Sequence, residues 1–243
     1  MSSLLIPVAP FSTTKSRLKD CFSADQLKEI TIAMFKDLIN TLSDVKCFKH
    51  KLVYCNASEI LELAEENGLI GIKEDLTNIP KSFDDVISEF NKISIERFNA
   101  KQTTLVFLDL ILITTKNFIE INDLLQKNQL VICPDIHSAG VSILSRNPPD
   151  IIPSSFSDSN TPSLVSLLDN ASKNKIRKIV IYDSFRAGFD MDIKQDLVLA
   201  YEYLKVFNLR DTEVFKFLKN NLKLSLKKKN VNDNRTFELL ESK

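Results

Sequence analysis

Thr103-Thr-Leu-Val-Phe-Leu-Asp109 is the stretch of this sequence that decides the fold. Its apolar run is unbroken from Leu105 to Leu108 and is ended by a carboxylate. Such a run is typical of a central parallel strand with both faces covered, because a strand with one face in water alternates apolar and polar residues. We therefore predict a central strand over 103–109, with Asp109 at its carboxyl end.

Segments typical of strands and helices alternate on both sides of this stretch. Short apolar segments bounded by turn residues predict strands, and apolar residues at helical spacing after capping residues predict helices. The predicted strands are 3–8, 48–55, 69–73, 103–109, 130–133, 141–145 and 176–182. The predicted helices are 23–42, 58–67, 83–98, 115–127, one opened by Thr161 as cap and Pro162 as first helical residue, and 193–205. This order predicts an α/β fold of the Rossmann type, with a mostly parallel central sheet and helices on both faces.

Length and composition fit one folded domain. The 243 residues are 44% apolar, which is enough for a sizeable core, and 32 Lys and Arg balance 32 Asp and Glu. That balance argues against a broad basic face for nucleic acid. No apolar run approaches the roughly 20 residues of a membrane span, and the N-terminus lacks a signal-peptide pattern. We expect a single cytoplasmic domain over 1–243, with a helix–strand extension at about 208–243, that binds neither nucleic acid nor membrane.

The residue types exclude several classes of chemistry. His50 and His137 are the only histidines in the sequence, which argues against a Ser-His-Asp triad and against a histidine-rich metal site. The four glycines form neither a G-x-G-x-x-G nor a P-loop pattern. The four cysteines form no C-x-x-C pair, which argues against a zinc knuckle. Any chemistry must rest on carboxylates, lysines, arginines and hydroxyls.

The loop after the first predicted strand places two cations among hydroxyls. It reads Pro7-Val-Ala-Pro-Phe-Ser-Thr-Thr-Lys-Ser-Arg17. A loop that follows a strand and leads into a helix can present amides, the Ser12 hydroxyl and the cations Lys15 and Arg17 to a polyphosphate. Two basic residues in a polar loop are more often plain surface, so the pattern by itself leaves both interpretations open.

Two groups of carboxylates are candidates for metal binding. Asp109 ends an apolar run, where a carboxylate is costly unless it is paired, bound to a metal or used as a helix cap. The second group lies in Tyr182-Asp-Ser-Phe-Arg-Ala-Gly-Phe-Asp-Met-Asp-Ile-Lys-Gln-Asp-Leu197. Asp190 and Asp192 alternate across Met191, so we expect one to point into the site and the other to cap the helix that begins near Ile193.

With these motifs the sequence resembles the 2-phospho-L-lactate guanylyltransferase family, CofC. The resemblance rests on residues 6–18, on the Leu-Asp-Leu stretch 108–110 and above all on residues 182–197. These motifs occur in the family's order, and the resemblance covers nearly the whole chain, including Leu222-Lys-Leu-Ser-Leu226. The resemblance implies a nucleotide-diphospho-sugar-transferase-like (GT-A-like) sandwich. It also implies transfer of GMP from GTP to 2-phospholactate or phosphoenolpyruvate with release of pyrophosphate, in the synthesis of the deazaflavin coenzyme F-420.

The resemblance assigns residues to each part of this reaction. GTP and a small phosphorylated carboxylic acid are the implied partners, and magnesium is the implied cofactor. The implied residues are Pro7, Ser12, Lys15 and Arg17 for the nucleotide; Lys15, Arg17, Asp109 and Asp192 for catalysis; Gly140, Ser157 and Ser159 for the acceptor; and Asp109 and Asp192, with Asp190 as the alternative, for magnesium.

Departures from the family pattern leave alternatives open. Ala9 stands where the family has lysine, Ile111 where it has proline, and the acceptor-side segments 138–141 and 157–160 differ from the family's glycine-rich sequences. One alternative is a nucleotidyltransferase for another phosphorylated acceptor or another base. The other is a nucleotide-binding paralogue with weakened catalysis. The apolar helices could also build the face of a homodimer, although one apolar stripe per helix is what a core needs.

Overall fold

A computed structural model describes residues 1–75, 81–136, 140–158, 160–225 and 238–240 of the chain. His137 and Ser159 therefore lie outside the described residues. The chain divides into two compact units, a first unit of Met1–Pro10 and Leu38–Asp190 and a second unit of Phe11–Asp37 and Met191–Lys243. One domain over 1–243 stays a prediction, and the two units are described separately.

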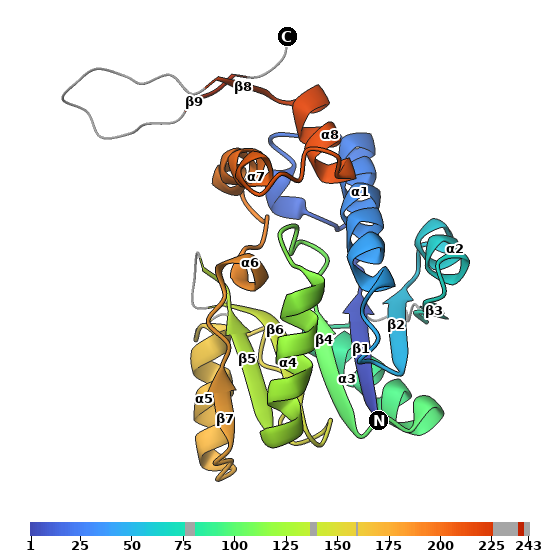
Figure 1. Cartoon of the computed structure of the whole chain (residues 1–243), viewed down its shortest axis with the longest axis vertical. Coiled ribbons are helices and arrows are strands. Elements are labelled where there is room, and N and C mark those ends of the chain that lie inside the picture. Colours follow the sequence, from blue (N-terminus) through green and yellow to red (C-terminus); the bar gives the residue numbers. More distant parts are fainter. Residues whose placement is uncertain (76–80, 137–139, 159, 226–237, 241–243) are drawn as a thin grey trace, which may run out of the picture. The chain divides into compact units, whose positions relative to one another are not determined.

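The first unit contains a seven-stranded sheet in the order β3-β2-β1-β4-β6-β5-β7 (Figure 1). Its strands are β1 Ser2–Pro7, β2 His50–Cys55, β3 Ile70–Lys73, β4 Gln102–Val106, β5 Leu130–Pro134, β6 Val141–Arg146 and β7 Ile179–Ile181. All neighbours pair in parallel except β6, which is antiparallel to both β4 and β5. The predicted mostly parallel sheet is confirmed.

Helices cover both faces of this sheet. The helices of the first unit are α2 Ser58–Glu66, α3 Phe83–Phe98, α4 Thr115–Lys127, α5 Ser163–Lys173 and the short α6 Phe185–Gly188. Phe90 of α3 and Leu167 of α5 belong to one core cluster with Leu5 and Leu105 of the sheet. Figure 1 draws α4 on the opposite side of the sheet from α3. Leu4, Leu5 and Ile6 of β1 and Leu105 and Val106 of β4 are fully buried, as expected for strands that are covered on both faces.

The second unit is mainly helical. It holds the 3-10 turn η1 Ser16–Leu18, the first part of α1 Ala24–Ser43, α7 Lys194–Val206, α8 Glu213–Asn221 and the strands β8 Lys223–Ser225 and β9 Glu238–Leu240. The Asp37 carboxylate accepts the backbone N–H groups of Glu213 and Val214, both at 2.9 Å. Burial raises the pKa of Asp37. The bonds join α1 to the first turn of α8, where N–H groups have no partner inside the helix.

The strand predicted over 103–109 ends sooner than expected. β4 stops at Val106, and Asp109 lies in the turn that follows rather than at the strand end. The pairing of β4 with β1 ends at Leu105, and its pairing with β6 ends at Val106. Phe107 and Leu108 continue the apolar sequence but pair with neither β1 nor β6, and apolar character alone does not reveal where pairing stops.

Two further predictions near the carboxyl half need correction, and one short helix there was not predicted. The strand predicted over 176–182 is limited to β7, because its pairing with β5 covers only Ile179–Ile181. Pro162 is the N-cap of α5 instead of its first helical residue, so Thr161 is not the cap. The helix α6 was not predicted, since four residues are too short to show helical periodicity.

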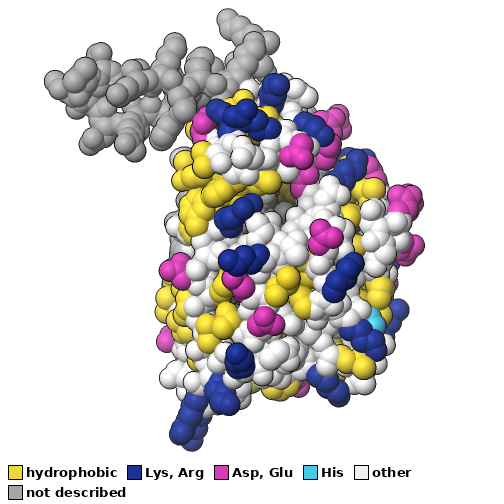
Figure 2. All heavy atoms as spheres, viewed as in Figure 1, with side chains coloured by type: hydrophobic (Ala, Val, Ile, Leu, Met, Phe, Trp, Pro, Cys, Tyr) yellow, Lys and Arg dark blue, Asp and Glu magenta, His cyan; other side chains and the backbone are white. Residues whose placement is uncertain are grey.

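The described residues form no membrane-spanning helix, and the face shown in Figure 2 does not carry charges of one sign only. Among the described residues, no helix combines the length and apolar character that crossing a bilayer requires. Figure 2 shows Lys and Arg side chains lying among Asp and Glu side chains on that face. On this face, positive and negative side chains are thus mixed, as the balanced composition suggests.

Candidate active site

Two carboxylates meet beyond the carboxyl end of β4 in the first unit. Asp109 lies in the turn after β4 and Asp190 follows α6, and an oxygen of each lies within 4.8 Å of an oxygen of the other. Both residues are half-buried, and Asp109 Oδ1 is shielded from solvent. Sheet order reverses between β1 and β4, which is where open α/β sheets bind ligands. Paired carboxylate oxygens are hard ligands, so these two residues fit a divalent cation such as Mg²⁺.

The position of Asp190 is set by α6. The Ser184 hydroxyl accepts the N–H of Ala187 at 3.3 Å and caps this short helix. Arg186 Nε donates to the Leu112 carbonyl at 2.7 Å, which ties α6 to the segment that follows Asp109. Burial lowers the pKa of Arg186. The helix that leads to Asp190 is therefore anchored to the segment that carries its partner carboxylate.

Gly188 allows α6 to approach the end of β5. Its carbonyl accepts the N–H of Ile136 at 3.0 Å. A Cβ atom at this position would lie 2.6 Å from the Pro134 carbonyl oxygen and 2.9 Å from Ile136 Cγ2. Because the first of these contacts is with backbone, a side chain at Gly188 would have to displace α6 or β5.

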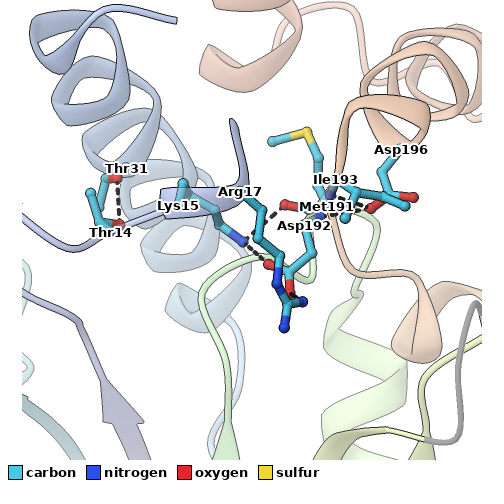
Figure 3. A network of polar contacts seen from close by, with 8 residues as sticks. All are labelled: Thr14, Lys15, Arg17, Thr31, Met191, Asp192, Ile193 and Asp196. Carbon is cyan, nitrogen blue, oxygen red and sulfur yellow. Dashed lines mark hydrogen bonds and ion pairs between the residues drawn. The ribbon is translucent and has the colours of Figure 1, made fainter. Parts of the chain in front are cut away.

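In the second unit, two cations bind the Asp192 carboxylate (Figure 3). Lys15 Nζ lies 2.7 Å from Asp192 Oδ1 and donates to the Met191 carbonyl at 2.9 Å, and Arg17 Nη1 lies 3.0 Å from Asp192 Oδ2. The Lys15 side chain is 8% exposed and that of Arg17 is 70% exposed. An exposed ion pair contributes little to stability, whereas a shielded ammonium is held firmly by its partners. Lys15 is thus the more fixed of the two cations.

Asp196 fixes the backbone next to Asp192. Its Oδ2 atom accepts the N–H groups of Asp192 and Ile193, both at 2.8 Å, and the residue is 2% exposed. The prediction that Asp190 or Asp192 caps the helix near Ile193 is therefore wrong. A carboxylate at the third helical position reaches back to the free N–H groups before the helix, as in a capping box.

The loop that carries Lys15 is also anchored to α1. The hydroxyl groups of Thr14 and Thr31 lie 3.1 Å apart (Figure 3). The Thr31 hydroxyl donates to the Leu27 carbonyl at 2.7 Å. Lys15 itself has a φ of 46°, in the left-handed region, at the start of η1. The sequence between Thr14 and Arg17 thus forms a tight turn that presents Lys15 toward Asp192.

The remaining residues that the resemblance assigns to the nucleotide and the acceptor lie in strands, turns and loops of different burial. Pro7 is buried as the last residue of β1 and pairs with Tyr54, and Ser12 is exposed in the turn after it. The Gly140 carbonyl accepts the N–H of Asp135 at 3.3 Å. Ser157 is exposed and bonded to Asp84. Ser159 lies outside the described residues.

Sequence reasoning missed Asp84, Asp196 and the anchoring role of Arg186. The Asp84 carboxylate bonds a segment more than seventy residues away. No local pattern predicts such a partner. Asp196 did carry a signal, because a carboxylate three residues into a helix is typical of a capping box.

Comparison with known proteins gives one family over nearly the whole chain. A family model described as "Guanylyl transferase CofC like" matches residues 2–238. A 2-phospho-L-lactate guanylyltransferase from Methanocaldococcus jannaschii is 27% identical over 195 residues, which cover 80% of this chain and 80% of the relative. The family match is consistent with the resemblance seen in the motifs.

Solved structures share the fold at low sequence identity. A protein of Desulfovibrio desulfuricans G20 assigned to the nucleotide-diphospho-sugar transferases has a TM-score of 0.69 at 13% identity, covering 90% of this chain and 94% of that one. A cytidylyltransferase from Leptospira borgpetersenii has a TM-score of 0.55 at 15% identity, covering 90% and 97%. These similarities confirm the predicted nucleotide-diphospho-sugar-transferase-like fold.

Gly188→Ala is expected to lower the free energy of unfolding by about 1–3 kcal/mol, because the added methyl group overpacks α6 against backbone. Urea unfolding of both proteins measures the difference. Gly71→Ala is the matched control, since its Cβ would meet only side-chain atoms, at 3.2 Å or more. Equal effects of the two substitutions would contradict the close approach of α6 to β5.

Proposed function

The chain belongs to the CofC-like guanylyl transferase family, and on this basis we propose that it transfers the GMP group of GTP to 2-phospho-L-lactate or phosphoenolpyruvate. The match over residues 2–238 is the observation that carries the proposal, and several Methanocaldococcus relatives are named 2-phospho-L-lactate guanylyltransferase. The product would serve the synthesis of coenzyme F-420, as the resemblance implies.

The reaction suits a site that lacks a histidine base. A phosphate oxygen of the acceptor attacks the α-phosphorus of GTP, the bond from that phosphorus to the bridging oxygen breaks, and pyrophosphate leaves. The attacking oxygen is already ionised at neutral pH, so no general base has to remove a proton. The chain's task is to hold polyanions in line and to offset the charge on the transferred and leaving groups.

Asp109 and Asp190 are the residues we propose for magnesium. Their oxygens lie within 4.8 Å of each other in the first unit, and both come from segments anchored through Arg186 and Leu112. Bound Mg²⁺ supplies positive charge to the phosphates. The resemblance makes Asp192 a ligand, with Asp190 as the alternative. The ion pairs of Asp192 with Lys15 and Arg17 favour Asp190 as the partner of Asp109.

Lys15 and Arg17 are the residues we propose for the triphosphate. They are cations on a loop that follows the end of β1, and the anchoring of that loop through Thr14 limits how far Lys15 moves. An anchored cation loses little conformational freedom when it binds an anion, which favours affinity. Lys15 and Arg17, which bind the oxygens of the Asp192 carboxylate, can donate to the oxygens of a phosphate group in the same way.

The purified protein is expected to release pyrophosphate from GTP when 2-phospholactate or phosphoenolpyruvate and magnesium are present. A coupled pyrophosphate assay with each nucleoside triphosphate in turn measures both base and acceptor preference. GTP binding without any pyrophosphate release would favour the weakened paralogue. Turnover with a different triphosphate or only with another phosphorylated acceptor would favour the other nucleotidyltransferase alternative.

Lys15→Ala and Arg17→Ala are each expected to weaken GTP binding by about 1.5–3 kcal/mol, the value of a charge-assisted hydrogen bond. Isothermal titration calorimetry with GTP measures the change. Lys19→Ala removes the same charge from an exposed position in the same loop and should leave affinity nearly unchanged. If all three variants lose affinity alike, only the net charge of the loop matters.

Asp109→Asn and Asp190→Asn are each expected to reduce turnover on the order of a hundredfold or more. Each substitution removes a negative ligand of the proposed magnesium ion, and with it part of the positive charge that stabilises the reacting phosphates. Steady-state kinetics at varied magnesium concentration measure it. Asp183→Asn, at an exposed position of the same motif, is the control. If Asp192→Asn is severe and Asp190→Asn mild, Asp192 is the metal ligand instead.

A further inference from the structure

Asp84 joins the start of α3 to the segment from Ser154 to Ser157, called here the acceptor segment. Its carboxylate oxygens accept the backbone N–H groups of Phe156 at 2.9 Å and of Ser157 at 2.8 Å. The Asp84 N–H in turn donates to the Ser157 hydroxyl at 3.2 Å. The contact is therefore reciprocal, and it reaches the residue that the family resemblance assigns to the acceptor.

The negative charge of Asp84 is compensated by the donors of the acceptor segment. Burial opposes its ionisation, but the N–H groups of Phe156 and Ser157 and the hydroxyls of Ser154 and Ser157 outweigh burial and lower the pKa of Asp84. The carboxylate is thus ionised at neutral pH and surrounded by donors. An anionic acceptor would be repelled by a bare carboxylate, so this compensation favours a supporting role over direct contact with the acceptor.

An aromatic cluster joins the acceptor segment to Phe107, on the segment that leads to Asp109. The ring centroids of Phe83 and Phe156 lie 5.9 Å apart, those of Phe83 and Phe107 5.8 Å, and those of Phe107 and Phe156 5.5 Å. Phe107 stands two residues before Asp109 in the chain. The acceptor segment is therefore held both by Asp84 and by a ring on the segment that carries the proposed metal ligand.

We propose that Asp84 is a positioning residue for the acceptor, which holds Ser157 and its neighbours at the distance from Asp109 that transfer requires. This inference rests on the proposed function. It adds a residue outside the motifs of the family resemblance, and it predicts that the acceptor and the nucleotide respond differently to the same substitution. Aspartate suits the role because two carboxylate oxygens can bind two successive N–H groups.

The test compares Asp84→Ala and Asp84→Asn with Asp85→Ala by steady-state kinetics, with GTP and acceptor varied in turn. Asp85 is the matched control, because its carboxylate bonds only the N–H and hydroxyl of Ser82 among the contacts described at this helix start. Asp84→Ala should raise the acceptor KM on the order of tenfold to a hundredfold and leave the GTP KM within about twofold. Asp84→Asn, which keeps one carbonyl oxygen as acceptor, should fall between wild type and Asp84→Ala.

The outcomes separate the inference from the proposed function. If the wild-type protein turns over and Asp84→Ala leaves the acceptor KM unchanged, or raises both KM values together, the positioning role is wrong and the proposed function stands. If Asp85→Ala raises the acceptor KM as much as Asp84→Ala, the effect belongs to the helix terminus and the positioning role is again wrong. Absence of pyrophosphate release from the wild type overturns both.

Discussion

The parallel pairing of β1 with β2 on one side and β4 on the other is the constraint on which the first unit depends. β1 aligns Ser3–Pro7 with β2 and Ser2–Leu5 with β4, so the carboxyl ends of all three strands lie at one edge of the sheet. Asp109 leaves the sheet at that edge. Burial of both faces makes the pairing obligatory, because an unpaired backbone group inside the core has no water to bind.

The described residues use aspartate repeatedly to fix backbone at the start of helices and loops. Asp37 accepts two successive N–H groups at the start of α8, Asp196 accepts two before α7, and Asp84 accepts two in the acceptor segment. Each contact satisfies donors that helical or sheet bonding leaves open. Because charge-assisted hydrogen bonds are strong and directional, each of these carboxylates holds the backbone segment that it binds in a fixed position. Asp109 and Asp190, by contrast, are the aspartates that we propose as ligands of magnesium.

Local sequence predicted those elements whose signals lie inside the element itself. The helices over 83–98 and 115–127 were predicted with the bounds that α3 and α4 have, since a periodic apolar stripe follows an N-terminal cap in each. The helix predicted from residue 23 begins with Ser23 and Gln26, and the side chain of each bonds the other's backbone N–H, as in a capping box. The resemblance to the guanylyltransferase family rested on short motifs and was confirmed by the match over residues 2–238.

What the sequence by itself determined is the alternation of strands and helices, the apolar centre of the sheet and the family. The tertiary structure decided that β6 runs antiparallel, that β4 ends at Val106, that Asp190 lies beside Asp109, and that Asp84 binds the acceptor segment. Periodicity and capping act between residues a few positions apart, so they can be read along the chain. Strand direction, ladder ends and contacts between distant carboxylates and amides depend on which segments meet in space, and no local pattern encodes that.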